Sequence, residues 1–210
     1  MSIYTKNMPQ IQLDGFALWF LLLAVAISMA NMVLNVNNPD IYSKMMIITL
    51  FNLLGVVVVA FNKRVDKEIT FQELNHIFTA LIVGLVCIYA SAMIIPVVFQ
   101  FSTLDNAIYN ILFMVAIATG EELFFRYFLF MFGYMLSGNI FIAAIMQASI
   151  FALFHVASYS AMGLTVNALI VAFIAGIIFL WQDIYTKRLS TSMITHIMWN
   201  TLPIIMGLLI

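Results

Sequence analysis

The sequence predicts an all-α fold, a polytopic integral membrane helical bundle with about seven transmembrane helices. Two observations carry this prediction. First, 65% of the 210 residues are hydrophobic, against roughly 45 to 50% in an ordinary soluble domain. Second, the apolar residues gather in charge-poor windows of roughly the 20 residues that a helix needs to cross a bilayer core of about 30 Å.

The membrane helices are expected at seven such windows, which are Phe16–Leu34, Met45–Phe61, Ile77–Phe99, Ala107–Leu136, Ile140–Ala157, Met162–Trp181 and Thr191–Ile210. Because Asp14 precedes the first window and no small-residue cleavage site ends it, we expect a retained helix rather than a signal peptide. Turns are expected at Asn38-Pro39 and Ser137-Gly138-Asn139, and a kink at Pro96. No linker or repeat divides the chain, so residues 1–210 are expected to form a single transmembrane domain.

The basic residues predict an orientation, because short loops rich in Lys and Arg stay on the cytoplasmic side of a membrane. With seven spans, three basic regions share one face, and they contain Lys6, then Lys63, Arg64 and Lys67, then Lys187 and Arg188. The amino terminus is therefore expected in the cytoplasm and the carboxyl terminus outside.

The charge content excludes nucleic-acid binding, and the cysteine content excludes redox or cysteine-rich zinc chemistry. The 8 Lys and Arg residues against 9 Asp and Glu give a net charge of −1, which leaves no basic surface for a nucleic acid. The single cysteine, Cys87, lies in an apolar run and is expected to be a small buried hydrophobic residue.

Three charged residues lie inside the fourth predicted membrane helix. The other charges are expected at segment ends or in loops. They are Glu121, Glu122 and Arg126. A charge in the middle of a membrane helix costs on the order of 2.5 to 3.5 kcal/mol, so such residues normally mark function. Glu122 and Arg126 are four residues apart and are expected to form an ion pair. Glu121 is rotated by about 100° from Glu122 and needs another partner.

Candidate partners lie in the fifth and seventh windows. His155 follows Phe151 by four residues, so this ring is expected to pack on the imidazole and orient it. His196 precedes Asn200 by the same spacing, and both are expected to address one substrate atom. The third histidine, His76, lies beside a charged loop and is expected to be interfacial, without an assigned role.

These groups suit a hydrolase. Glu121 with His155 would activate water, and His196 and Asn200 would donate hydrogen bonds to the oxyanion of the tetrahedral intermediate. An equally economical chemistry places a zinc ion on Glu121, His155 and His196, with the attacking water as fourth ligand. The usual H-E-x-x-H zinc helix is absent. The sequence leaves both alternatives open.

The three elements, in this order on successive helices, resemble the motifs of the CPBP family of intramembrane proteases, over residues of about 107–210. That family includes the CAAX prenyl endopeptidases and the bacteriocin-processing and self-immunity proteins, also called Abi. The resemblance implies that Glu121 and His155 activate water, and that His196 and Asn200 hold the oxyanion. Glu122, Arg126 and Phe151 would support the site. Some members were first described as metalloproteases, so the resemblance does not choose between the two mechanisms.

Two features depart from the family pattern. The CAAX prenyl protease branch is similar to an eight-helix arrangement, whereas seven windows are counted here. In addition, His155 would lie near the outer end of its helix and His196 near the inner end of its own, so straight helices would separate them. A broken fourth helix, a tilt or an error in a helix boundary would be needed to bring them together, and a boundary error is the expected reason.

The expected function is an intramembrane endopeptidase that hydrolyses a membrane-associated peptide or protein, either CAAX-protease-like or peptide-processing, in a prokaryotic cell membrane. One alternative is a non-catalytic immunity or scaffold protein whose polar core binds a partner. Another is an ion-coupled transporter, which predicts paired interrupted helices that the sequence lacks. The oligomeric state does not follow from the sequence.

Overall fold

The computed structural model describes residues 11–34, 37, 39–61, 71–94, 104–156 and 166–208. Within these ranges the chain is helical and contains no strand beyond an isolated bridge between Gln12 and Arg188. The elements are α1 (Gly15–Leu34), α2 (Pro39–Phe61), α3 (Phe71–Ile94), α4 (Leu104–Glu122), the π-helix η1 (Leu123–Leu129), α5 (Phe130–Ser137), α6 (Ile140–Phe154), α8 (Val166–Thr186) and α9 (Leu189–Leu208). The predicted all-α fold is confirmed.

The helices follow the hydropathy windows closely. Because α4, η1 and α5 run on without a break, the described residues form seven continuous helices, and each overlaps one window. Two of them are long and apolar enough to cross a membrane, Ala107–Ser137 and Val166–Thr186. The number of membrane-spanning helices therefore stays a prediction.

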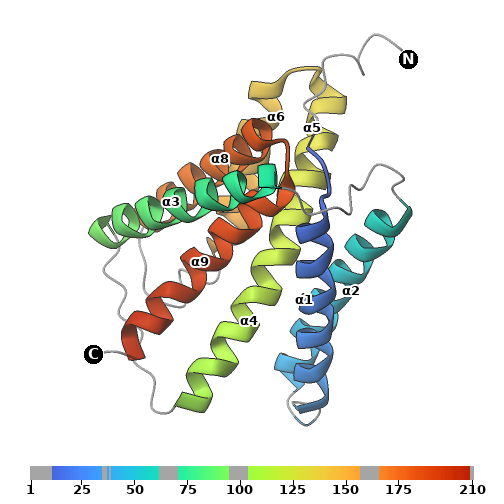
Figure 1. The fold of residues 1–210 in the computed structure, drawn as a ribbon, viewed down its shortest axis with the longest axis vertical. Helices are drawn as coiled ribbons and strands as arrows, with labels where there is room; N and C mark the ends of the chain where they lie inside the picture. The colour runs from blue at the N-terminus through green and yellow to red at the C-terminus, as the bar shows by residue number, and fades with distance from the viewer. Residues whose placement is uncertain are drawn as a thin grey trace.

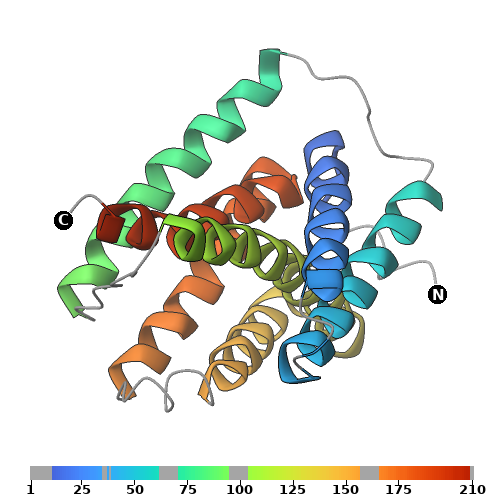
Figure 2. The ribbon, with the colours of Figure 1, turned by 90° about the horizontal axis from the view of Figure 1, so that it is seen from below.

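The central helix is α4 together with η1 and α5 (Figure 1). It packs on α9 and on α1, while α1 pairs with α2 at the edge of the bundle. α6 packs on both α5 and α8, and α3 packs chiefly on α9. Viewed from below, α3 lies on the outside of the bundle and α4 near its middle (Figure 2). The acidic end of α4 is therefore enclosed by several helices.

The surface and the interior have the polarity expected of a protein in lipid. Large apolar side chains are exposed, among them Tyr89 at 72% and Phe141 at 79%, whereas Glu122, Arg126 and Asp183 are fully buried. In water such a surface would be an aggregation hazard, but lipid solvates it. Polar groups then face inward, where other helices satisfy them.

The turn between α5 and α6 is confirmed where it was expected. Gly138 has a φ of 64°, a left-handed conformation that glycine adopts without strain, and its N–H donates to the Tyr134 carbonyl. The Asn139 side chain then caps α6 by accepting from the Phe141 and Ile142 N–H groups. Of the other expected features, Asn38 and Pro96 lie outside the described residues, and Pro39 begins α2.

Three polar residues lie deeper than the sequence suggested. Asp14 and Asp183 were expected at the ends of apolar segments, but they are only 2% and 0% exposed. His76, expected near the membrane interface beside a charged loop, is only 4% exposed, and its depth in the membrane stays a prediction. α3 begins before its window and α8 ends after its own, so His76 and Asp183 lie within helices, whereas Asp14 precedes α1 and is enclosed through its contacts with Ser190 and Arg188. Cys87 is buried, as expected.

Candidate active site

Glu122 and Arg126 form the ion pair that their spacing predicts. Arg126 Nε lies 3.1 Å from Glu122 Oε2, and both side chains are fully buried. The Arg126 guanidinium also lies over the face of Phe151, 4.1 Å from the ring centre, and 5.3 Å from that of Phe179. A buried guanidinium is stabilised by such aromatic faces as well as by its carboxylate. Phe151 therefore supports the pair directly.

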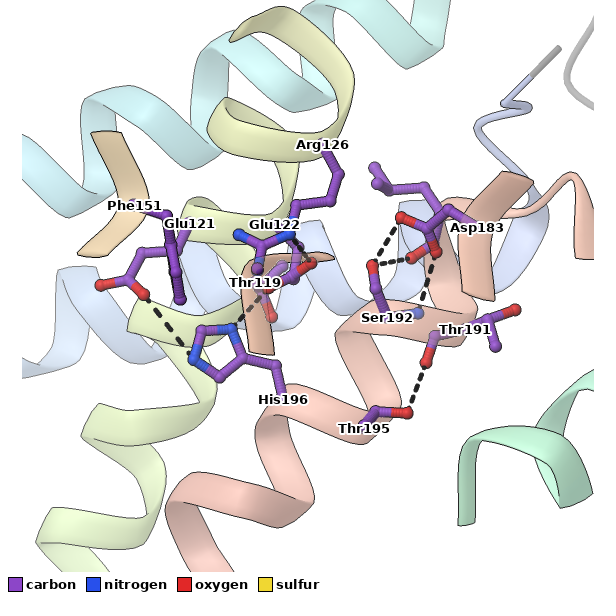
Figure 3. A network of polar contacts seen from close by, with 12 residues as sticks. Thr119, Glu121, Glu122, Arg126, Phe151, Asp183, Thr191, Ser192, Thr195 and His196 are labelled. Atoms are coloured by element: carbon purple, nitrogen blue, oxygen red, sulfur yellow. Dashed lines mark hydrogen bonds and ion pairs between the residues drawn. The ribbon is translucent and has the colours of Figure 1, made fainter. Parts of the chain in front are cut away.

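Glu122 has a second partner that the sequence did not suggest. His196 Nδ1 lies 2.6 Å from Glu122 Oε1, so this carboxylate bridges Arg126 and His196. A carboxylate accepts hydrogen bonds, so Nδ1 of His196 is the donor. The opposite nitrogen, Nε2, then faces Glu121, with 3.7 Å between it and Oε2 (Figure 3). Glu122 thus orients the ring toward Glu121.

His155 approaches the same oxygen from α6. It forms the C-cap of that helix, and its Nδ1 lies 2.8 Å from the Phe151 carbonyl oxygen. Because a carbonyl only accepts, Nδ1 carries the proton, and in the neutral ring Nε2 is the nitrogen that accepts one. Nε2 lies 3.8 Å from Glu121 Oε2. The Phe151 ring packs on the imidazole with 4.6 Å between ring centres, as its spacing predicts.

The two imidazoles therefore meet at one carboxylate oxygen despite the separation expected of straight helices. α6 ends at Phe154, so its C-cap residue His155 lies beside Glu121, and the central helix changes to π geometry directly after Glu122. Short π segments widen a helical turn and occur often at functional sites. The sequence windows predicted that His155 and His196 lie at different depths. In the structure, the Nε2 atoms of both rings lie within 4 Å of Glu121 Oε2.

Glu121 differs from Glu122 in what its oxygens contact. Its side chain is 13% exposed, and Oε2 accepts no hydrogen bond from the described residues. The distances of 3.7 and 3.8 Å to the two histidines are longer than a hydrogen bond. Such loose contacts are common in unliganded catalytic sites and tighten when substrate binds. Glu122 Oε2 also accepts no hydrogen bond but lies 3.1 Å from Arg126 Nε, whereas Glu121 Oε2 contacts only the two imidazoles among the charged groups described.

Asn200 lies one helical turn beyond His196 on α9 and is partly buried. Its side chain forms no hydrogen bond with another described residue. The spacing of four residues puts it on the same face of α9 as His196. Its role as an oxyanion donor stays a prediction.

The described residues allow a geometric test of the alternative in which a zinc ion is bound. Glu121, His155 and His196 come together, but no group of three or more His, Cys, Asp or Glu there has the arrangement to hold a metal ion. We therefore derive no catalytic step through a metal. A zinc ion on these three residues stays a separate prediction.

Sequence reasoning missed a hydrogen-bonded pair next to the site. Asp183 of α8 accepts from the Ser192 backbone N–H at 3.0 Å and from the Ser192 hydroxyl at 2.8 Å. The signal was present in the run Ser190-Thr191-Ser192, because hydroxyl residues at a helix start often have polar partners. The predicted window ended at Trp181, which left Asp183 outside the membrane helix.

A second acid–histidine cluster lies nearer the start of α9. The Ser190 hydroxyl donates to Asp14 Oδ2 at 2.5 Å and lies 3.1 Å from His76 Nε2. Arg188 NH1 lies 3.7 Å from the same Asp14 oxygen. We call these four residues the Asp14 cluster. It ties the segment before α1 to α3 and to the start of α9.

The comparison with protein families agrees with the geometry of this half of the chain. Residues 103–202 match the family model described as Type II CAAX prenyl endopeptidase Rce1-like. No curated protein and no solved structure matches the chain. The matched region contains Glu121, His155, His196 and Asn200. Residues 103–202 are therefore similar to type II CAAX prenyl endopeptidases, which is consistent with the resemblance of the three motifs to the CPBP family of intramembrane proteases.

Proposed function

We propose that this protein is an intramembrane endopeptidase of the CAAX type, which hydrolyses a peptide bond in a membrane-associated protein or peptide. The family match supports the reaction class. One observation carries the proposal for this chain: Nε2 of His155 and Nε2 of His196 both face Oε2 of Glu121. A structural ion pair explains Glu122 and Arg126, but it leaves this arrangement around Glu121 unexplained.

In the proposed reaction a water molecule lies beside Glu121 and His155. Its oxygen bonds to the scissile carbonyl carbon while its proton passes to the glutamate and histidine pair. The proton then moves to the leaving amine as the carbon–nitrogen bond breaks. His155 suits this transfer because the Phe151 carbonyl holds the proton on Nδ1 and leaves Nε2 to accept and return one.

The oxyanion of the intermediate would be held from α9. Asn200 supplies an amide donor, and His196 supplies Nε2 once the ring carries a second proton. Glu122 stabilises that cation, because its carboxylate lies at Nδ1. Arg126 in turn balances the charge of Glu122 in the interior.

The proposed setting is a prokaryotic cell membrane with the amino terminus in the cytoplasm. The distribution of Lys and Arg supports the orientation, the apolar exposed surface supports the lipid environment, and the compact, Lys/Asn/Ile-containing chain favours a prokaryotic membrane. The substrate is a protein or peptide anchored in the same membrane, which brings its scissile bond to the depth of Glu121.

A cleavage assay tests this proposal. The purified protein in liposomes is incubated in ¹⁸O-labelled water with a farnesylated peptide that ends in a CAAX sequence, and the products are identified by mass spectrometry. We expect release of the last three residues and one ¹⁸O atom in the new carboxyl group, with no cleavage by the Glu121→Gln variant. An intact peptide, or equal cleavage by Glu121→Gln, contradicts the proposal. A cellular phenotype that survives Glu121→Gln would favour the scaffold alternative.

A further inference from the structure

The start of α9 is held by two aspartates from different parts of the chain. Asp14 accepts from the Ser190 hydroxyl, and Asp183 accepts from Ser192. All four side chains are at most 2% exposed. The first N–H groups of a helix lack partners within the helix, so a carboxylate that accepts from one of them fixes the position of the helix start.

The two serines lie on different faces of α9 relative to His196. At about 100° per residue, Ser192 is rotated by about 40° from His196 and lies one turn before it. Ser190 is rotated by about 240° and faces away. Figure 3 shows Asp183 and Ser192 facing each other, with His196 further along the same helix. Of the two aspartate contacts, therefore, only that of Asp183 with Ser192 lies on the face of α9 that carries His196.

Asp183 also lies close to the charged core of the site. Arg126, which pairs with Glu122, interacts electrostatically with Asp183 as well. The carboxylate of Asp183 therefore holds the helix turn before His196 through Ser192, and its charge also acts on the arginine that pairs with Glu122. Asp183 takes no direct part in the proposed reaction.

We infer that Asp183 and Ser192 are positioning residues for His196, which fix the rotation of α9 so that Nδ1 bonds to Glu122 and Nε2 faces Glu121. The inference rests on the proposed function for its effect on catalysis, but its geometric part stands independently. A displacement of about 1 Å at such a site lowers turnover by as much as about 10²-fold. Substrate contacts elsewhere are unchanged, so the loss falls on kcat.

Ser190→Ala is the matched control for Ser192→Ala. Both serines are fully buried in the first turn of α9, and each donates to an aspartate. We expect Ser192→Ala to lower kcat at least about tenfold per folded molecule with KM unchanged, whereas Ser190→Ala keeps kcat. Ser192→Thr retains the hydroxyl and should restore turnover. Equal kcat in the two alanine variants overturns the inference.

A spectroscopic measurement separates this inference from the proposed function. In protein with ¹⁵N-labelled histidine, the proton of the 2.6 Å bond between His196 and Glu122 should give a far-downfield NMR signal, assigned by its loss in His196→Gln. We expect Ser192→Ala and Asp183→Asn to shift or remove it, and Ser190→Ala to leave it. An unchanged signal in Ser192→Ala and Asp183→Asn overturns the inference even if no peptide is cleaved. If wild type gives no cleavage while the signal responds as expected, the proposed function fails and the positioning role stands.

Discussion

Two clusters of this molecule use the same residue types in different ways. The Asp14 cluster and the site around Glu121 each combine a carboxylate, a histidine and an arginine, and both contact α9. In the Asp14 cluster the carboxylate accepts the Ser190 hydroxyl, and Asp14 and His76 are at most 4% exposed. In the site, Glu121 Oε2 accepts no hydrogen bond from the described residues, and the Glu121 and His155 side chains are 13% and 17% exposed.

This difference separates a structural cluster from a candidate catalytic one. A buried carboxylate that already accepts a hydrogen bond and lies beside cations has little capacity left for a substrate. A carboxylate that two imidazoles approach without bonding keeps its acceptor sites for water. We therefore assign the Asp14 cluster to stability and Glu121 to chemistry, and the following variants test this division.

The largest difference in kcat is expected between variants of His155, in the candidate site, and of His76, in the Asp14 cluster. His155→Gln removes the proposed proton acceptor, so kcat should fall by about 10²- to 10⁴-fold with little change in melting temperature. His76→Gln should lower the melting temperature and leave kcat per folded molecule unchanged. Steady-state cleavage and thermal unfolding in detergent measure both quantities. A kcat loss in His76→Gln as large as that in His155→Gln would contradict the assignment of the Asp14 cluster to stability alone.

Glu122→Gln tests the structural part of the site itself. Removing this charge leaves Arg126 buried without its carboxylate partner, which costs about 3 to 5 kcal/mol. We expect poor accumulation of folded protein, whereas Glu121→Gln should accumulate as wild type does. Size-exclusion chromatography of the two variants compares them. Equal accumulation with equal loss of cleavage would mean that the two glutamates do not differ in role.

Asn200→Ala tests the role on α9 that the geometry leaves open. Loss of one oxyanion donor lowers kcat by about 10²-fold or more, with little change in KM. The same peptide assay reports both constants. If kcat is that of wild type, Asn200 takes no part in the reaction.

Chelation is expected to have the smallest effect. If Glu121 and His155 activate water without a metal, cleavage should continue at the wild-type rate after treatment with a strong chelator, and elemental analysis should find no stoichiometric zinc. Activity that disappears with the chelator and returns with added zinc would instead support the ligand set Glu121, His155 and His196.

The sequence predicted the helices well because hydropathy reports burial in lipid directly, and each window overlaps one helix. The Glu122 and Arg126 pair and the Phe151 and His155 contact were also predictable, since both lie within one helical turn. The hydrogen bond from His196 to Glu122 was not, because it joins residues 74 positions apart. No pattern of spacing marks that contact, and the π-helical turn after Glu122 likewise has no periodic signal.

The buried aspartates show where hydropathy windows fail. Asp14 and Asp183 each lie within a few residues of an apolar window and were expected at its end. Each is enclosed by other parts of the chain and accepts a hydrogen bond from a serine of α9. Sequence averaging cannot register a polar residue that is enclosed through a tertiary contact, so such residues are found only once the helices are placed.

A comparison of Glu121→Gln with Asp14→Asn tests the catalytic role of Glu121 most directly. Initial rates of cleavage of the farnesylated peptide are measured in liposomes at equal amounts of folded protein. We expect a loss of at least about 10²-fold in Glu121→Gln and the wild-type rate in Asp14→Asn. Wild-type cleavage by Glu121→Gln, or an equal loss in both variants, would contradict that role.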